Sequence, residues 1–335
     1  MSKRVFVTRP IPDGPLRRLA ESARVDLWDD DHPPPHAELV ERLASADAVI
    51  SMISDRFDAA TIAQLTRLRI ISNFAVGLDN VDLEAATRAG IAVGHTPGVL
   101  AETTADLAFA LLMATARRVA EGDRYVRAGR WRNWTPRLML GRDIFGATLG
   151  IIGWGEIGQA VARRATGFGM RILYSAHQSS RIRSFALPAP PATPVDLGEL
   201  LATADFISIS VPLTDQTRHL IGPHEFAVMK REAILINTSR GGVIDQEALV
   251  TALKLERIAG AGLDVTEIEP IAADDPLLQF PNVIVTPHIG SASHATRIKM
   301  AEVAVDNVLD VFAGRLPGRC ANPSVAMRAP RNSAT

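Results

Sequence analysis

The chain has 335 residues, of which 47% are apolar and 22% are charged, and its formal net charge is −1. This composition is typical of a globular protein and argues against a basic nucleic-acid binder or an acidic disordered partner segment. No apolar run reaches the roughly eighteen residues of a membrane span, the N-terminal segment lacks the apolar core of a signal peptide, and the single Cys320 has no partner for an internal disulfide. We therefore expect two domains in the cytoplasm and no chemistry at Cys320.

In the first part of the chain, short apolar strand patterns alternate with helical patterns. Strands are predicted at residues 4–9, 24–28, 47–53 and 68–75, and helices at 15–23, 37–46, 58–66 and 82–90. A long helical pattern follows at 101–127, and its middle is apolar nearly all round, which predicts burial on most sides. Residues 129–146 then form a connector that carries Trp131 and Trp134 and that could project from the globule.

A second alternation begins at Ala147. Strands are predicted at 148–153, 171–176, 205–213, 233–239, 258–265 and 282–288, and helices at 156–169, 196–204, 225–230, 245–257 and 292–313. Residues 184–195 are proline-rich, which predicts irregular structure. Strands that alternate with helices in this way indicate parallel sheets covered on both faces, so the predicted fold class is α/β.

A glycine motif lies between the strand at 148–153 and the helix that follows it. Gly153 permits a tight turn, Gly155 lets the backbone approach a pyrophosphate, and Gly158 lets the helix pack close to the strand. The helix N-terminus then offers N–H groups to the phosphates. The motif predicts a bound dinucleotide, and the alternative is a glycine-rich turn without a ligand.

The next strand lacks the acidic residue that NAD enzymes place at its end. No Asp or Glu occurs from Ile157 to Val195, and His177, Arg181 and Arg183 follow the strand instead. A carboxylate would accept hydrogen bonds from the ribose hydroxyls of NAD, whereas cations favour a 2′-phosphate. The sequence therefore favours NADP(H), with NAD(H) possible. The alternative is that these basic residues belong to a solvated loop.

Polar residues with catalytic chemistry follow three later strands. Arg240 follows the strand at 233–239, Asp264 and Glu269 follow 258–265, and His288 ends 282–288. Ligands meet an open α/β sheet at the carboxyl ends of its strands. Taken singly, each residue could be an ion-pair partner, a solvated carboxylate or a structural histidine. No Cys, His or Asp spacing suggests a metal site.

A string of motifs gives the chain a resemblance to a known family. The motifs are VGLDNVDL, TPGVLAETTADLAFALLMATAR, GIIGWGEIGQAVA, INTSRGGVID, GLDVTEIEP and TPHIGSAS. Together they resemble the D-isomer-specific 2-hydroxyacid dehydrogenases, from Arg4 to about Pro317. Within that family the segment from Val126 to Gly153 is most similar to the glyoxylate/hydroxypyruvate reductases.

The resemblance implies two Rossmann-like or flavodoxin-like domains. Residues 1–98 plus 291–320 would form the substrate domain, 99–290 the NAD(P)-binding domain and 321–335 a loose tail, with the active site in the interdomain cleft. A homodimer would form through residues 101–147. Trp131 and Trp134 are costly to leave in water, so we expect them at this interface, with Trp134 reaching the substrate. The alternative is that they pack within the chain.

The resemblance also assigns roles to residues. Arg240 would hold the substrate carboxylate, His288 would donate the proton, and Glu269 would stabilise the charged imidazole, as the chemistry of these side chains allows. Val76 and Gly77 would bind the carboxylate through backbone N–H groups. The residues implied in cofactor binding are Thr104, Gly153, Trp154, Gly155, Glu156, Ile157, Gly158, Ala176, His177, Gln178, Arg181, Val211, Pro212, Thr217, Thr238, Ser239, Asp264 and Gly290.

The predicted function is reduction of glyoxylate or hydroxypyruvate by NADPH to a hydroxy acid, of D configuration where the product is chiral. Three related reactions stay open: those of D-3-phosphoglycerate, D-lactate-type and phosphite dehydrogenases. Formate dehydrogenases usually pair the histidine with Gln, and Glu269 fits a keto-acid reductase better. A non-catalytic protein that senses NAD(P) is the alternative of another class.

Overall fold

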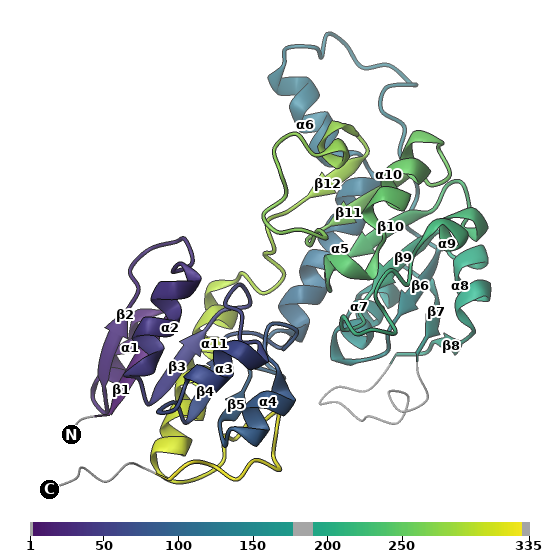
Figure 1. The fold of residues 1–335 in the computed structure, drawn as a ribbon. Coiled ribbons are helices and arrows are strands. Elements are labelled where there is room, and N and C mark those ends of the chain that lie inside the picture. Colours follow the sequence, from purple (N-terminus) through teal and green to yellow (C-terminus); the bar gives the residue numbers. More distant parts are fainter. Residues whose placement is uncertain (1–2, 177–189, 330–335) are drawn as a thin grey trace, which may run out of the picture. The chain divides into compact units, whose positions relative to one another are not determined.

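The computed structural model describes residues 3–176 and 190–329 (Figure 1). Its contacts divide the chain into two compact units. Unit 1 comprises Met1–Leu100 and Ala292–Thr335, and unit 2 comprises Ala101–Ser291. The predicted divisions fall after residues 98 and 290. Within the described ranges, no helix combines the length and the apolar character needed to cross a bilayer.

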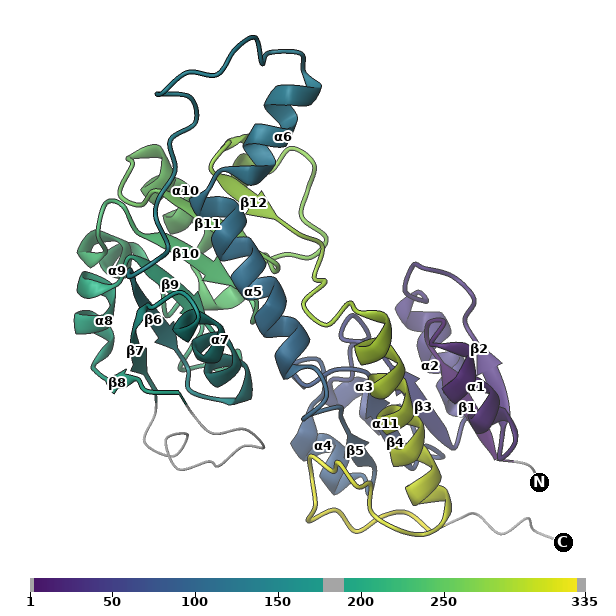
Figure 2. The same cartoon turned by 180° about the vertical axis from the view of Figure 1, so that it is seen from behind.

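Unit 1 is built on a five-stranded parallel sheet in the order β2-β1-β3-β4-β5. The strands are β1 (Arg4–Val7), β2 (Arg24–Leu27), β3 (Ala48–Ser51), β4 (Ile70–Asn73) and β5 (Ala92–Gly94). The helices are α1 (Asp13–Ala20), α2 (His36–Ala44), α3 (Ala59–Gln64), α4 (Leu83–Arg88) and α11 (His294–Phe312). Apolar residues of α2, α3 and α4 form one core with the sheet, while α11 packs on β3, β4 and β5 (Figure 2). The C-terminal helix therefore completes the N-terminal unit.

The C-terminal segment is bound to unit 1 as far as Ala329. The side chain of Asn322 accepts from the Val93 N–H at 2.8 Å and donates to the Ile91 carbonyl at 3.0 Å. Arg328 donates to the carbonyl oxygens of Leu65 and Leu68. Residues 321–328, which were predicted to belong to a loose tail, are thus held to unit 1 by polar contacts with its backbone. Residues 330–335 lie outside the described part.

Unit 2 is built on a seven-stranded parallel sheet in the order β12-β11-β10-β9-β6-β7-β8. The strands are β6 (Thr148–Ile152), β7 (Arg171–Ser175), β8 (Thr193–Pro194), β9 (Phe206–Ile209), β10 (Ile234–Asn237), β11 (Gly260–Leu263) and β12 (Val283–Val285). The helices are α5 (Ala101–Ala116), α6 (Val119–Arg127), α7 (Glu156–Thr166), α8 (Leu197–Thr203), α9 (Pro223–Val228) and α10 (Gln246–Lys254). The short edge strand β8 lies where irregular structure was predicted, and an edge is where a sheet tolerates proline.

The strands of unit 2 bury side chains on both faces, as parallel strands must. Leu149 and Ile151 of β6 pack with α5 and α7, while Ile152 packs with α8, α9 and α10. Gly150 lies between them, and a Cβ there would lie 2.5 Å from Cδ2 of Leu200 on α8. The missing side chain thus lets α8 approach the centre of the sheet. The two parallel α/β units confirm the predicted fold class.

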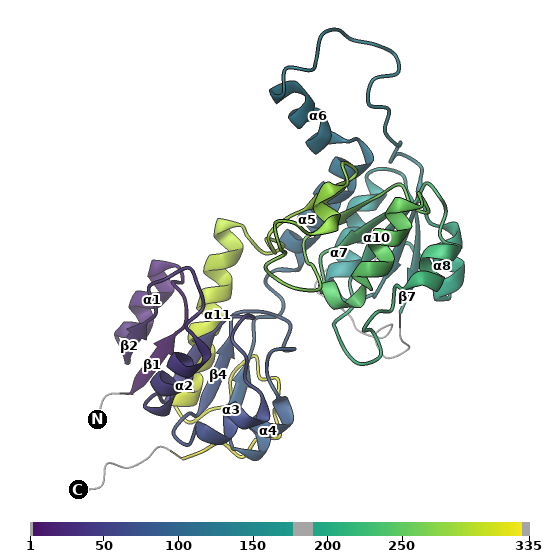
Figure 3. The ribbon, with the colours of Figure 1, turned by 45° about the horizontal axis from the view of Figure 1, so that its top comes forward.

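The helical pattern predicted over 101–127 is broken into α5 and α6. Arg118 between them has a φ of 54°, and its guanidinium binds Glu121 at 2.7 and 2.8 Å. The returning chain donates the Arg142 N–H to the Ala116 carbonyl at 2.8 Å, at the end of α5. This contact joins residues far apart in the chain, so the local pattern did not reveal it. α6 and the segment after it extend from the rest of unit 2 (Figure 3).

We call residues 117–147 the arm. No residue of α6 is buried, and the exposed fractions of Trp131 and Trp134 are 59% and 73%. Packing of these tryptophans within the chain, one of the two alternatives above, is therefore contradicted.

Candidate active site

Most of the predicted site residues lie at one edge of the seven-stranded sheet. The parallel register aligns the ends of neighbouring strands, pairing Asn237 with Ile209 and with Leu263, and Leu263 with Val285. The turns after β6, β9, β10, β11 and β12 therefore begin at the same level. The chain order reverses between β6 and β9, which is the switch point where open α/β sheets bind ligands.

The glycine turn after β6 has the shape that a dinucleotide requires. Gly153 has a φ of 98°, and a Cβ there would lie 2.5 Å from the Ser210 carbonyl oxygen. A Cβ at Gly158 would lie 2.2 Å from the Gly153 carbonyl oxygen, so the helix packs against the turn. A Cβ added at Gly155 would have no described atom within 4 Å, so the space beside this residue is open. Gly155 is the N-cap residue of α7, and no side chain caps the N–H groups of the helix there. Open space before an uncapped helix N-terminus fits a pyrophosphate.

Other predicted cofactor residues surround this turn. Trp154 is buried and stacks on Tyr174, with ring centroids 4.1 Å apart. Glu156 and Ile157 begin α7. Apart from Asp264, the other described ones follow β7, β9, β10 and β12 or lie in the first turn of α5, namely Ala176, Val211, Pro212, Thr217, Thr238, Ser239, Gly290 and Thr104. His177, Arg181 and Arg183, which favoured NADP(H) together with the missing acidic residue, and Gln178, another predicted cofactor residue, lie outside the described residues.

Two buried hydroxyl groups at this edge have no hydrogen-bond partner among the described residues. They are the Oγ of Ser210, after β9, and the Oγ1 of Thr238, after β10. Buried hydroxyls normally have partners, so both fit a polar ligand. Thr238 was predicted, whereas Ser210 was missed. Its only signal in the sequence is its place at the end of a buried strand.

Arg240 lies in a turn that Asn237 holds. The Asn237 side chain donates to the Arg240 carbonyl oxygen at 2.9 Å and accepts from the Ser239 N–H at 3.0 Å. The Arg240 guanidinium is partly buried and donates to the Ser239 carbonyl at 2.8 Å. A Cβ at Gly241 would lie 1.9 Å from the Thr266 carbonyl carbon, so this turn packs against the one after β11. Asn237 was not predicted as a site residue.

Glu269 and His288 form a direct pair. The Nδ1 atom of His288 lies 2.8 Å from Oε2 of Glu269, and both side chains are about one-third exposed. The other oxygen, Oε1, accepts from the Thr266 N–H at 3.2 Å. Because Nδ1 faces the carboxylate, Nε2 is left for another partner. The structure thus brings together two of the three predicted catalytic side chains, and it places the turn of Arg240 beside them.

Asp264 is buried and binds the turn that carries His288. Its Oδ1 accepts from the Ile289 N–H at 2.8 Å and from the Thr286 hydroxyl at 2.6 Å, while Oδ2 accepts from the Gly290 N–H at 2.7 Å. His288 itself has a φ of 52°, an uncommon value for a non-glycine residue. The Asp264 carboxylate therefore holds a backbone conformation that the sequence alone would disfavour.

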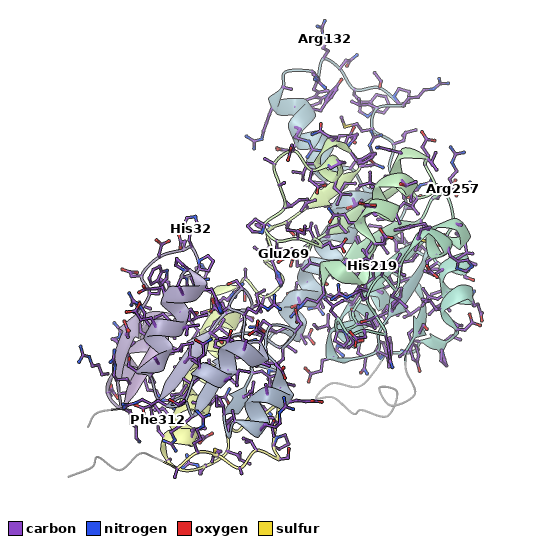
Figure 4. All side chains as sticks on the ribbon, in the orientation of Figure 1. His32, Arg132, His219, Arg257, Glu269 and Phe312 are labelled. Atoms are coloured by element: carbon purple, nitrogen blue, oxygen red, sulfur yellow. The ribbon has the colours of Figure 1, made fainter. Side chains whose placement is uncertain are left out.

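Three predicted substrate residues lie elsewhere. Val76 and Gly77 follow β4 in unit 1, where their carbonyl oxygens bind the side chains of His95 and Asn73 at 3.0 Å. Trp134 is in the arm, which is well apart from Glu269 within unit 2, as the position of Arg132 shows (Figure 4). Within one chain, Trp134 is therefore not brought to the Glu269–His288 pair.

The sheet, the glycine turn at its switch point and the paired histidine define a class of protein, the nucleotide-dependent oxidoreductases of Rossmann type. Residues 109–290 match the family model described as D-isomer specific 2-hydroxyacid dehydrogenase, NAD binding domain. A glyoxylate reductase of Korarchaeum cryptofilum is 52% identical over 326 residues, which are 97% of each chain.

Solved structures are also similar to this chain over nearly its whole length. A protein of Thermus thermophilus is 48% identical with a TM-score of 0.88, over 95% of this chain and 99% of that one. An NADPH-dependent glyoxylate/hydroxypyruvate reductase of Sinorhizobium meliloti, solved with NADP and malonate, is 32% identical with a TM-score of 0.84, over 98% and 100%. The chain belongs to the D-isomer-specific 2-hydroxyacid dehydrogenase family and is an NAD(P)-dependent oxidoreductase, which confirms the predicted resemblance.

The contacts of Asp264 can be tested without substrate. Asp264→Asn replaces one acceptor oxygen by an NH₂ group that must face N–H or hydroxyl donors. We expect the free energy of unfolding to fall by about 2 kcal/mol, and the amide hydrogens of Ile289 and Gly290 to exchange faster. Chemical denaturation and hydrogen exchange measure the two effects. Asp143→Asn, the same change at an exposed site, is the control, and unaltered exchange at Ile289 and Gly290 would contradict the role of Asp264.

Proposed function

We propose that the protein reduces glyoxylate and hydroxypyruvate, with NADPH as the preferred reductant, to glycolate and D-glycerate. The observation that carries this proposal is the 2.8 Å contact of Glu269 with His288, at the sheet edge that also holds Arg240 and the glycine turn. The named relatives support it, because the K. cryptofilum protein is a glyoxylate reductase and the S. meliloti protein reduces glyoxylate and hydroxypyruvate.

In this proposal each side chain has a separate role in the reduction of a 2-keto acid. The Arg240 guanidinium binds the substrate carboxylate and polarises the neighbouring carbonyl group. When bound, the reduced nicotinamide supplies a hydride to the carbonyl carbon. The carbonyl oxygen becomes negative as the C–H bond forms, and His288 gives it the proton carried on Nε2. Glu269 stabilises the charged imidazole and orients the ring through Nδ1. Val76 and Gly77 would add N–H donors for the carboxylate.

Two lines support NADPH over NADH. The sequence has no Asp or Glu between Ile157 and Val195, so no carboxylate there competes with a 2′-phosphate. The S. meliloti relative is named as NADPH-dependent. His177 and Arg181 would contact the 2′-phosphate in this proposal.

The arm supports a homodimer. Six large apolar residues of the arm are more than half exposed, namely Val119, Val126, Trp131, Trp134, Leu140 and Phe145. So many exposed apolar side chains in one segment are costly in water and are typical of an interface with a second copy. In such a dimer, Trp134 would reach the substrate of the partner. A cytoplasmic location is part of the same proposal.

A panel of short 2-keto acids with each reduced cofactor tests the function. We expect glyoxylate and hydroxypyruvate to consume NADPH rapidly, with kcat/KM for NADPH at least about 10-fold above that for NADH, which is roughly 1.4 kcal/mol. Steady-state absorbance measures both values. Absence of turnover with every keto acid would contradict the reductase, and an equal or higher kcat/KM with NADH would contradict the cofactor preference alone.

Substitutions should separate the roles of Arg240 and His288. His288→Gln should lower kcat by about 10²- to 10⁴-fold, because the proton donor is lost. Arg240→Met should raise the KM for glyoxylate as well as lower kcat, since it removes the carboxylate partner. His224→Ala, an exposed histidine on α9, is the control and should retain wild-type kinetics. A His288→Gln enzyme with near wild-type kcat would show that another group donates the proton.

The arm predicts how the oligomer responds to substitution. Trp131→Ala combined with Trp134→Ala should shift the protein from a dimeric to a monomeric elution volume, because buried aromatic side chains dominate interfaces. Leu255→Ala changes an exposed apolar residue of unit 2 outside the arm and should leave the dimer intact. Light scattering after size exclusion measures the mass. A wild-type protein that elutes as a monomer would contradict the proposed interface.

A further inference from the structure

Unit 2 contains a second histidine–glutamate pair beside the first. We infer that His219 and Glu267 form a positioning pair, which fixes the turn that carries Glu269 and thereby sets the orientation of His288. The inference rests on the proposed function for its kinetic consequence. Its structural consequence, the effect on the His288 ring, can be measured without substrate.

The pair joins the turn after β9 to the turn after β11. Nε2 of His219 lies 2.8 Å from Oε1 of Glu267, and the side chains are 43% and 32% exposed (Figure 4 labels His219 and Glu269). The backbone of His219 is also held, because its N–H donates to the Gly242 carbonyl at 2.9 Å. His219 has a φ of 50°, a left-handed conformation that is unfavourable for a residue with a Cβ. Its ring and backbone contacts therefore maintain an unfavourable conformation at this position.

The peptide between Thr266 and Glu267 is enclosed from several directions. Gly241 packs on it, since an added Cβ would lie 1.9 Å from the Thr266 carbonyl oxygen and 2.4 Å from the Glu267 nitrogen. The Glu267 N–H donates to Oε1 of Gln246 at 3.1 Å, and Nε2 of Gln246 donates to Asp275 at 2.9 Å. The His219 ring, which belongs to the turn after β9, holds the Glu267 side chain.

The residue on the N-terminal side of this peptide, Thr266, contacts the catalytic pair through its own N–H group. The Thr266 N–H binds Oε1 of Glu269 at 3.2 Å, and the Thr266 hydroxyl binds the Ile268 carbonyl at 2.8 Å. A displacement of Glu267 therefore moves the group that orients Glu269, and Glu269 orients His288. A small misplacement of a proton donor can lower a rate by up to about 10²-fold.

The turn of Arg240 has contacts that loss of the His219 ring leaves in place. Asn237 binds both Ser239 and the Arg240 carbonyl oxygen, and the bond from His219 to Gly242 comes from the backbone N–H of His219. Loss of the His219–Glu267 pair should therefore affect proton transfer more than carboxylate binding. The expected signature is a lower kcat with little change in the KM for glyoxylate.

The chain provides a matched control for the experiment. His224 also pairs with a glutamate, Glu225, at 3.1 Å, but its side chain is 84% exposed and lies on α9. His219→Ala should lower kcat about 10-fold and change the KM for glyoxylate by less than about 2-fold, whereas His224→Ala should leave both values unchanged. His219→Gln keeps a hydrogen-bond donor for Glu267 and should recover most of the lost kcat. The free energy of unfolding is measured for each variant.

A spectroscopic readout makes the test independent of turnover. The chain has eight histidines, so the ring ¹⁵N resonances can be resolved after histidine-selective labelling. His219→Ala should shift the Nδ1 and Nε2 resonances of His288, and His224→Ala should not. Unmoved His288 resonances would overturn the inference even in an inactive enzyme, and so would wild-type kcat in His219→Ala. If His219→Ala lost free energy of unfolding and kcat in proportion, and His219→Gln did not restore kcat, the role of the pair would be merely structural. That result would also overturn the inference. If the wild-type enzyme fails to turn over, the proposed function falls, and the resonances alone decide the positioning role.

Discussion

The arrangement of unit 2 depends on one buried carboxylate. Asp264 continues from β11, its N–H donates to the Asn237 carbonyl at 2.8 Å, and its side chain accepts from the backbone of Ile289 and Gly290. A buried carboxylate is tolerable only when donors replace the water it has lost. Here the donors are backbone groups of the turn after β12, so satisfying the charge also fixes the position of His288. Asp264 thus holds in place the turn that carries His288, the proton donor of the proposed reaction.

The parallel register explains why residues far apart in the chain share one edge. Each strand of the pair β10–β11 and of the pair β11–β12 ends opposite its neighbour, so the turns that follow start together. One hydrogen bond, from Asn237 to Arg240, then holds the turn after β10, and the contact of Glu269 with His288 joins the turns after β11 and β12. No single loop forms the site. Its rigidity comes from the sheet, which keeps charged groups in place before any substrate is bound.

Much of this could be predicted because it depends on local pattern. Apolar runs predicted the strands, and the polar residues after them, together with the family motifs, made Arg240, Glu269 and His288 the catalytic candidates. The rest depends on contacts between distant segments, which a single sequence does not display. The break at Arg118 follows from a bond between Arg142 and Ala116, and the attached C-terminal segment follows from Asn322. Supporting side chains were missed for the same reason, because an asparagine or serine after a strand has no distinctive signal.

Unit 1 is made of two segments that lie far apart in the chain, and this affects the order in which the protein can fold during synthesis. Residues 4–94 supply all five strands, but the helix that covers β3, β4 and β5 is α11, which is translated some two hundred residues later. Until α11 leaves the ribosome, the part of the sheet that it covers lacks this helix, whereas every strand and helix of unit 2 precedes it in the nascent polypeptide. Unit 2 can therefore fold before unit 1 is complete, and an apolar surface near the amino terminus must be kept from aggregation until α11 has emerged.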